Sequence, residues 1–153
     1  MTTTHPTAAP VPPPRPPRGG SVFPSPPPPS VSTPADLLAG ADRLLGTATA
    51  STTGVWPRAV ALLLRHALEE ALRRYWQARK PQLARCPPHA QALCLASYAD
   101  QDTARRWSAT WGGLSRACHY HGYELKPTQV ELRAWRDEVE RVVGALEPRP
   151  DDR

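Results

Sequence analysis

Apolar residues recur at helical spacing in four stretches of the chain, and no stretch alternates apolar and polar residues as a half-buried strand does. The first stretch begins at Thr33-Pro34-Ala-Asp36, which offers an N-cap, a proline at the first helical position and a carboxylate for the positive end of the helix dipole. One apolar face then consists of Leu37, Leu38, Ala41, Leu44 and Leu45.

The second stretch predicts the longest helix, from Trp56 to Arg79, because Pro57 suits its start and Pro81 prevents its continuation. Its apolar stripe consists of Val60, Leu64, Ala67, Leu68, Ala71, Leu72 and Tyr75. The spacing also predicts two i,i+4 ion pairs, Glu69–Arg73 and Glu70–Arg74.

The third stretch is broken into a short piece, Pro88 to Tyr98, and a longer one for which Asp100 and Asp102 are candidate caps. The longer piece has a stripe, predicted to be buried, of Ala104, Trp107, Trp111, Leu114 and Cys118. Gly112-Gly113 interrupts it, which close approach of another helix would explain. Arg116 lies outside the stripe, so it can face a groove while Cys118 packs inward.

The fourth stretch starts after Lys126-Pro127 with Thr128-x-x-Glu131, the pattern of a capping box. Its stripe consists of Leu132, Trp135, Val139, Val142, Val143 and Leu146, and we expect Trp135 to be buried like Trp107 and Trp111. The whole pattern predicts an all-α domain over residues 34–147, with four main helices of which the third is broken.

Both ends of the chain differ from this domain in composition. Residues 1–34 hold 13 of the 20 prolines, and residues 1–33 lack the apolar groups that would offset the entropy of ordering. We therefore expect a disordered, polyproline-II-biased tail over 1–33 and a disordered terminus over 148–153. Pro13 to Arg18 also matches the P-x-x-P-x-R pattern of SH3-type ligands, which any proline- and arginine-rich run produces.

Net charge and cysteine content limit which partners and which cellular setting the sequence allows. The net charge is +5, of which +2 lies in the tail, so contact with a polyanion is permitted but not demanded. Three cysteines and no recognisable signal peptide favour a reduced, cytoplasmic setting. No apolar run approaches 18 residues, so we expect no membrane-spanning helix and no membrane partner.

Two further site readings stay open at this stage. A zinc site is one possibility, with candidate ligands Cys86, His89, Cys94, Cys118, His119 and His121. Cys94 and Cys118 occupy apolar positions of their helices, so buried free thiols are the alternative. We expect no metal and no cofactor. The arginines of the second helix offer a basic face for nucleic acid, against the alternative of a solvated helix surface: Arg58, Arg65, Arg73, Arg74 and Arg79.

The most chemically informative stretch is Leu114 to Tyr123, which contains Arg116, then four residues, then His121, Gly122 and Tyr123. Arginine holds an anion bidentately without losing its proton, and histidine takes and gives a proton near neutral pH, so the pair is suited to phosphate chemistry. His119 competes with His121, because three residues after Arg116 it would lie nearer the arginine on a continuous helix. Spacing alone leaves that choice open.

The order of parts resembles the HEPN superfamily (higher eukaryotes and prokaryotes nucleotide-binding domain), whose hallmark is Arg-x4-6-His. Arg116-x4-His121-Gly122-Tyr123 is similar to the Arg-x4-His-x-Tyr form in HEPN toxins that pair with minimal nucleotidyltransferase antitoxins. The resemblance covers about residues 35–147 and selects His121 as the motif histidine. One position departs: the residue after the motif arginine is usually polar in the family, and here it is Ala117.

The resemblance implies an up-and-down helical bundle and metal-independent RNA cleavage by a homodimer. Arg116 would hold the scissile phosphate, His121 would act as general acid or base, and Tyr123 would orient the phosphate or the histidine and be the antitoxin's target. The alternative is an inactive HEPN-like module that binds a nucleotide or protein partner. A sequence-specific DNA-binding role ranks third, because no short recognition helix is evident.

Overall fold

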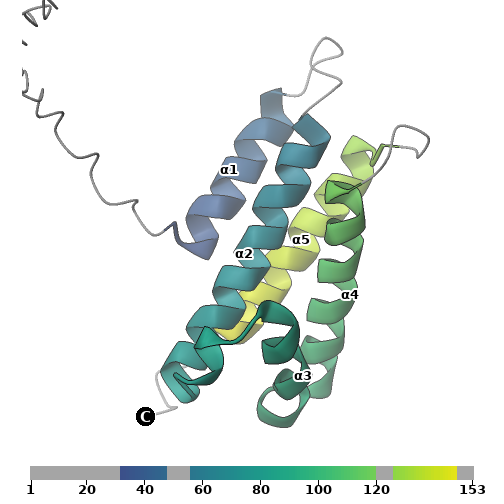
Figure 1. The fold of residues 1–153 in the computed structure, drawn as a ribbon. Coiled ribbons are helices and arrows are strands. Elements are labelled where there is room, and N and C mark those ends of the chain that lie inside the picture. The colour runs from purple at the N-terminus through teal and green to yellow at the C-terminus, as the bar shows by residue number, and fades with distance from the viewer. Residues whose placement is uncertain (1–31, 48–55, 120–125, 148–153) are drawn as a thin grey trace, which may run out of the picture. The chain divides into compact units, whose positions relative to one another are not determined.

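A computed structural model describes residues 32–47, 56–119 and 126–147, and every regular element within those residues is helical. The elements are α1 (Pro34–Thr47), α2 (Trp56–Arg79), the 3-10 turn η2 (Leu83–Arg85), α3 (Pro88–Tyr98), α4 (Gln101–Cys118) and α5 (Gln129–Leu146) (Figure 1). The all-α prediction is confirmed for the described residues. The broken third unit is two separate helices, α3 and α4, so the four main helices become five.

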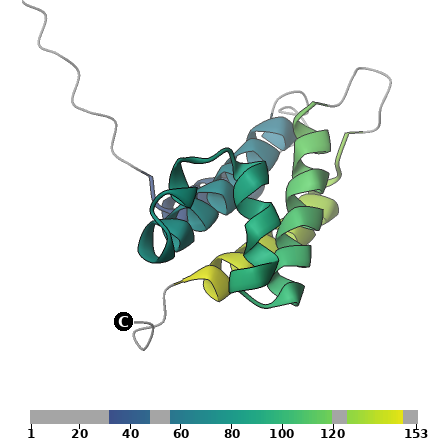
Figure 2. The ribbon, with the colours of Figure 1, turned by 60° about the horizontal axis from the view of Figure 1, so that its bottom comes forward.

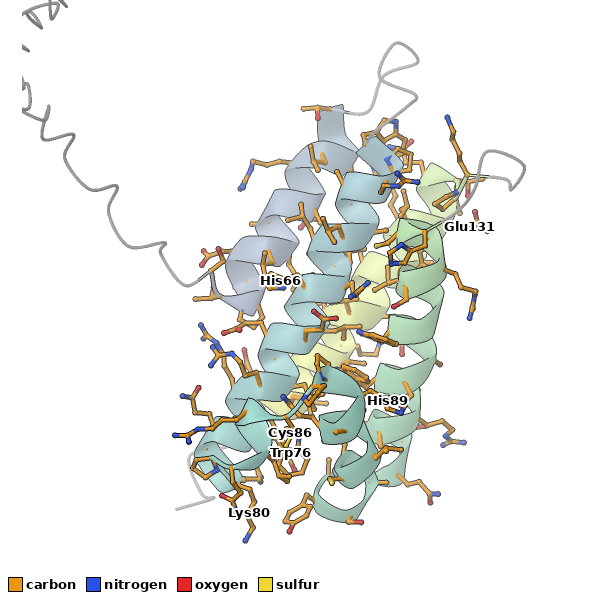
Figure 3. All side chains as sticks on the ribbon, viewed as in Figure 1. His66, Trp76, Lys80, Cys86, His89 and Glu131 are labelled. Carbon is orange, nitrogen blue, oxygen red and sulfur yellow. The ribbon has the colours of Figure 1, made fainter. Side chains whose placement is uncertain are left out.

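The long helices α1, α2, α4 and α5 run in alternating directions, and α2 packs against each of the other three (Figure 1). Helix α3 lies where α2 ends and α4 begins, and it contacts both (Figure 2). Lys80, Cys86 and Trp76 mark that end of the bundle, whereas Glu131 marks the opposite end, where α4 finishes (Figure 3). The bundle therefore has an α3 end and an end formed by the last turn of α4.

Side-chain caps fix three of the helix starts at the predicted positions. The Thr33 hydroxyl accepts the Asp36 N–H at 3.1 Å, and the Asp36 carboxylate accepts the Thr33 N–H at 2.8 Å. Thr128 and Glu131 form the reciprocal capping box at the start of α5. Asp100 caps α4 by accepting the Thr103 N–H at 2.8 Å. Each cap satisfies a backbone donor that has no partner within its helix.

The core lies between the inner face of α2 and the stripes of α1, α4 and α5. The Trp107 side chain is 1% exposed, and its Nε1 donates to the Leu68 carbonyl of α2 at 3.1 Å. Its ring stacks on that of Trp111, with centroids 5.9 Å apart and planes 12° from parallel. A Cβ at Gly113 would lie 3.4 Å from the Trp135 ring, so the missing side chain there allows α5 to approach α4 closely.

Two expectations about burial and pairing are wrong. Trp111 and Trp135 are only partly buried, because their rings lie at the edges of the seams rather than in the centre of the core. The predicted Glu69–Arg73 pair does not form: Glu69 instead accepts from Arg65 Nε at 2.9 Å and from Trp111 Nε1 at 2.8 Å.

The predicted Glu70–Arg74 pair is confirmed at 2.8 Å, and Arg73 joins it at 2.6 Å. The Glu70 carboxylate is buried between these two guanidinium groups. Burial acts to raise the pKa of Glu70, but the hydrogen bonds from Arg73 and Arg74 outweigh it, so the pKa lies below its ordinary value. The sequence did not indicate that this glutamate belongs to the core.

The predicted tail and C-terminal segment lie outside the described residues, apart from residues 32 and 33, as does the turn at residues 120–125. Among the described helices, none is both long enough and apolar enough to cross a membrane.

Candidate functional site

Arg116 lies in the last turn of α4, on the side of the helix that faces solvent. The helix ends immediately after it: the His119 N–H donates to the Arg116 carbonyl at 3.0 Å, and His119 is exposed. Ala117 and Cys118 between them are buried, at 6% and 8% exposure. The prediction that Arg116 lies outside the buried stripe while Cys118 packs inward is confirmed.

The guanidinium of Arg116 has no carboxylate partner among the described residues, which distinguishes it from most arginines of the bundle. The guanidinium extends back toward Gly112, one turn earlier, where an added Cβ would lie 3.8 Å from it. By contrast, each of the following arginines forms an ion pair: Arg65, Arg73, Arg74, Arg105, Arg106, Arg136 and Arg141. Arg116 is thus a cation held at a helix end and able to accept an anion.

The charges that act on the Cys118 thiol show which other cations lie near this end of α4. Burial raises the pKa of the Cys118 thiol, while the charge and hydrogen bonding of Arg65 and the charge of Arg58 act in the opposite direction. Arg58 and Arg65 belong to the first half of α2, so this half of α2 lies beside the last turn of α4. The buried thiol is a packing group rather than a nucleophile.

A polar cluster joins α2 to α4 just below the candidate site. The Arg65 guanidinium lies 5.3 Å from the Trp111 ring centroid and also binds Glu69, which in turn accepts the Trp111 indole N–H. His66 lies on the same face, with Nδ1 3.9 Å from the Glu69 carboxylate. This cluster fixes the position of α4 along the axis of α2, and it therefore also positions Arg116. Sequence reasoning missed it, because helical periodicity does not reveal which cross-helix partner a residue at the seam edge meets.

The other residues of the motif, His121, Gly122 and Tyr123, lie in the segment 120–125, outside the described residues. The structure thus describes Arg116, Ala117 and His119 but not the geometry between Arg116 and His121. Because α4 ends at Cys118, His119 is the C-cap residue and not part of a continuous helix with Arg116. The choice between His119 and His121 stays a prediction, because His121 lies outside the described residues.

The sequence also left open a zinc site and a basic face on α2, and the structure bears on both. Among the residues that the structure describes, no three His, Cys, Asp or Glu side chains are grouped as metal ligands, and the Cys86 thiol donates to the Gln82 carbonyl instead. Three of the five arginines of the proposed basic face of α2 form ion pairs within the helix, because Arg65 binds Glu69 while Arg73 and Arg74 share Glu70. These internal pairs are what a solvated helix surface shows.

Comparison of the chain with protein-family models, with curated proteins and with solved structures finds no match. The candidate site therefore stands on its residues and on the end of α4 that carries Arg116.

Proposed function

We propose that this chain is a metal-independent endoribonuclease of the HEPN type, acting as a homodimer. The observation that carries the proposal is Arg116: an exposed arginine without a carboxylate partner in the described structure, at the helix end that leads within five residues to His121. The order of helices also supports it, since a broken third unit ending in Arg-x4-His is followed by a capped last helix.

The chemistry assigns each residue a role. Arg116 holds the scissile phosphate and stabilises the charge that builds on its oxygens in the transition state. His121 removes the proton from the 2′-hydroxyl, or protonates the leaving 5′-oxygen, a role worth about 10²–10⁴-fold in rate. Attack of the 2′-oxygen on phosphorus breaks the bond to the 5′-oxygen. Tyr123 orients the phosphate or the histidine.

Two protomers contribute to one cleft in this proposal, so the active species is the dimer. The biological setting is that of a toxin in a toxin–antitoxin, stress or defence system, with a minimal nucleotidyltransferase as the antitoxin that modifies Tyr123. A neighbouring gene for such an enzyme would support this setting.

The decisive experiment compares wild type with Arg116→Ala and His121→Ala on single-stranded RNA in the presence of EDTA. Wild type should cleave RNA but not DNA, because DNA lacks the 2′-hydroxyl nucleophile. Each single variant should lose most activity, and the double variant should be little worse than either, as residues acting as one catalytic unit behave. Intact RNA after incubation with purified wild-type dimer would reject the enzyme.

His119→Ala is the matched control, because this histidine is exposed and lies two residues from His121. It should cleave RNA like wild type. Loss of cleavage in His119→Ala with retention in His121→Ala would reassign the working histidine.

The second candidate is an inactive HEPN-like module that binds a nucleotide or a protein partner. Ala117 favours it: the side chain is buried in the core and supplies no polar group next to Arg116, where the family usually has one. Binding of a nucleotide that Arg116→Ala weakens, in a protein that leaves RNA intact, would identify this module.

A further inference from the structure

A second surface of interest lies at the α3 end of the bundle, away from Arg116. A pocket of about 290 Å³ opens between the end of α2, the junction of α3 with α4, and the end of α5. Its polar and aromatic lining consists of Tyr75, Arg79, Tyr98, Asp100 and Glu147. The proposed cleavage reaction uses none of these residues.

Tyr98 is the exposed aromatic ring of this pocket, with 48% of its surface accessible to solvent. The ring is nevertheless held in place, because it packs edge to face against the fully buried Trp76 at 5.2 Å and 80°. Trp76 in turn packs edge to face against Tyr75 at 5.1 Å. An accessible ring whose orientation is fixed from behind is what a stacking platform requires, since little rotamer freedom is lost when a planar group lies on it.

Cations accompany both tyrosines. Lys80 Nζ lies 6.0 Å from the Tyr98 ring centroid, and the Arg79 guanidinium lies 4.4 Å from the Tyr75 centroid. Lys80 and Trp76 are seen at the same end of the bundle in Figure 3. Sites that hold single-stranded nucleic acid without base specificity combine these two elements: an aromatic face for the base and a cation for the adjacent phosphate.

Two carboxylates also line the pocket and limit where a phosphate can lie. Asp100 is committed to its cap, where it accepts both the N–H and the hydroxyl of Thr103, at 2.8 and 2.6 Å. Glu147 is exposed at the end of α5. Because Lys80 Nζ lies over the Tyr98 ring, the phosphate is expected at Lys80 and the base on the part of the ring that stays exposed.

We propose that Tyr98 and Lys80 form an accessory site for single-stranded RNA, which binds a nucleotide of the substrate away from the cleaved bond. The proposal rests on the proposed RNA-cleaving function and adds to it a reason for preferring long substrates. Arg116 lies 15 residues along α4 from Gln101, about 22 Å at 1.5 Å per residue. A strand stacked at about 3.4 Å per nucleotide needs about seven nucleotides to cover that distance.

The test measures binding of a fluorescent 12-nucleotide single-stranded RNA to the full chain carrying Arg116→Ala, so that cleavage does not interfere. Adding Tyr98→Ala should weaken binding about fivefold to a hundredfold, whereas Tyr98→Phe should restore it, because stacking needs the ring and not the hydroxyl. Adding Lys80→Ala should weaken binding and reduce the slope of log K against log salt by about 0.7. Arg43→Ala is the charge-matched control on exposed α1 and should leave binding unchanged.

Cleavage separates this proposal from the proposed function. In an otherwise wild-type chain, Tyr98→Ala should raise KM for the 12-nucleotide RNA without lowering kcat, and it should leave cleavage of a trinucleotide unchanged. If wild type cleaves both RNAs and Tyr98→Ala changes neither KM nor binding, the accessory site is rejected while the enzyme stands. If no RNA is cleaved but the 12-nucleotide RNA binds through Tyr98, only the enzyme is rejected.

Other outcomes reject the accessory site as well. Equal losses in Tyr98→Ala and Tyr98→Phe would exclude stacking. A synthetic proline- and arginine-rich peptide that binds through Tyr98 and Glu147, with no RNA bound there, would make the pocket a peptide site. Absence of RNA binding by the Arg116→Ala chain would also reject the accessory RNA site. Melting curves of all variants check that the fold is retained.

Discussion

The two ends of α4 differ in how their charged side chains are used. At the first end, Asp102 binds Arg105 and Arg106, and Arg106 also reaches Glu138 of α5 at 2.9 Å. At the last end, Arg116 has no carboxylate partner in the described structure and His119 is exposed. The first end thus pairs its charges within α4 and anchors the helix to α5, while the last end carries polar groups that the described fold does not require. Residues that stability does not explain are the better candidates for function.

The largest expected effect tests the anchored part of α4. Trp107→Ala should lower the free energy of unfolding by about 3–5 kcal/mol, because it empties a buried site and removes the indole hydrogen bond to the Leu68 carbonyl. Urea denaturation measures the loss. Trp111→Ala should cost less, because the Trp111 ring is only partly buried. Equal losses of unfolding free energy would show that the Trp107 and Trp111 rings contribute equally to stability.

The next prediction compares the two ends of α4 directly. Arg116→Ala should change the free energy of unfolding by less than about 0.5 kcal/mol, as expected for a surface residue without a partner. Asp100→Ala should lower the melting temperature clearly, because the Thr103 N–H loses its cap. Both are read from thermal melts under the same conditions. If Arg116→Ala melts as early as Asp100→Ala, Arg116 is a structural residue and the contrast between the ends fails.

A smaller effect should appear in acid. Hydrogen bonds from Thr103 hold the pKa of Asp100 below its ordinary value, and those from Thr33 and Thr128 do the same for Asp36 and Glu131. Because these pKa values are lowered in the folded state, the stability they contribute is present above the ordinary carboxyl values, 3.8 for Asp and 4.5 for Glu, and is lost as pH falls through the lower folded-state values.

Melting temperature measured from pH 6 downward should therefore fall most steeply below about pH 4.5. Asp100→Asn is the matched variant, since asparagine also caps helices but does not titrate. Its melting temperature should depend less on pH than that of wild type. An unchanged pH dependence would remove Asp100 from the acid response.

The smallest effect concerns the glycines of α4. Gly112→Ala should stabilise the helix by up to about 1 kcal/mol, because an added Cβ meets only the flexible end of Arg116, at 3.8 Å. Gly113→Ala should gain less, because its Cβ would lie 3.4 Å from the Trp135 ring, at the short limit of ordinary van der Waals contact. Gly144→Ala, with open space around it, is the control for the helix propensity alone. A gain at Gly113 equal to that at Gly144 would show that α4 and α5 do not approach as closely as described.

These comparisons also show what the sequence predicts and what it does not. Proline and cap residues act on their own helix, so the bounds of α2 and the starts of α3, α4 and α5 follow from Pro57, Pro88, Asp100 and Thr128. Periodicity gives the inward face, as it does for Trp107. It does not give the depth of a residue at a seam edge, which is why Trp111 was expected to be more buried than it is.

Cross-helix polar partners are harder to predict, since they depend on the height of one helix against another. Glu69 binds Arg65 and Trp111 because α4 supplies an indole N–H at that height, a fact absent from the sequence of α2. For the candidate site, the outward position of Arg116 follows from helical spacing alone. The relation of His121 and Tyr123 to Arg116 depends on the backbone of residues 120–125, which lies outside the described structure, so those assignments stay predictions.

The parallel rings of Trp107 and Trp111 give the protein an intrinsic optical signal. Two indoles with centroids 5.9 Å apart and planes 12° from parallel couple their electronic transitions, and that coupling disappears when the helix unwinds or its rotamers change. Circular dichroism in the aromatic region can therefore follow the seating of α4 on α2 without any attached dye. Because Trp111 also binds Glu69 beside Arg65, the same signal would register any ligand that shifts the last turn of α4.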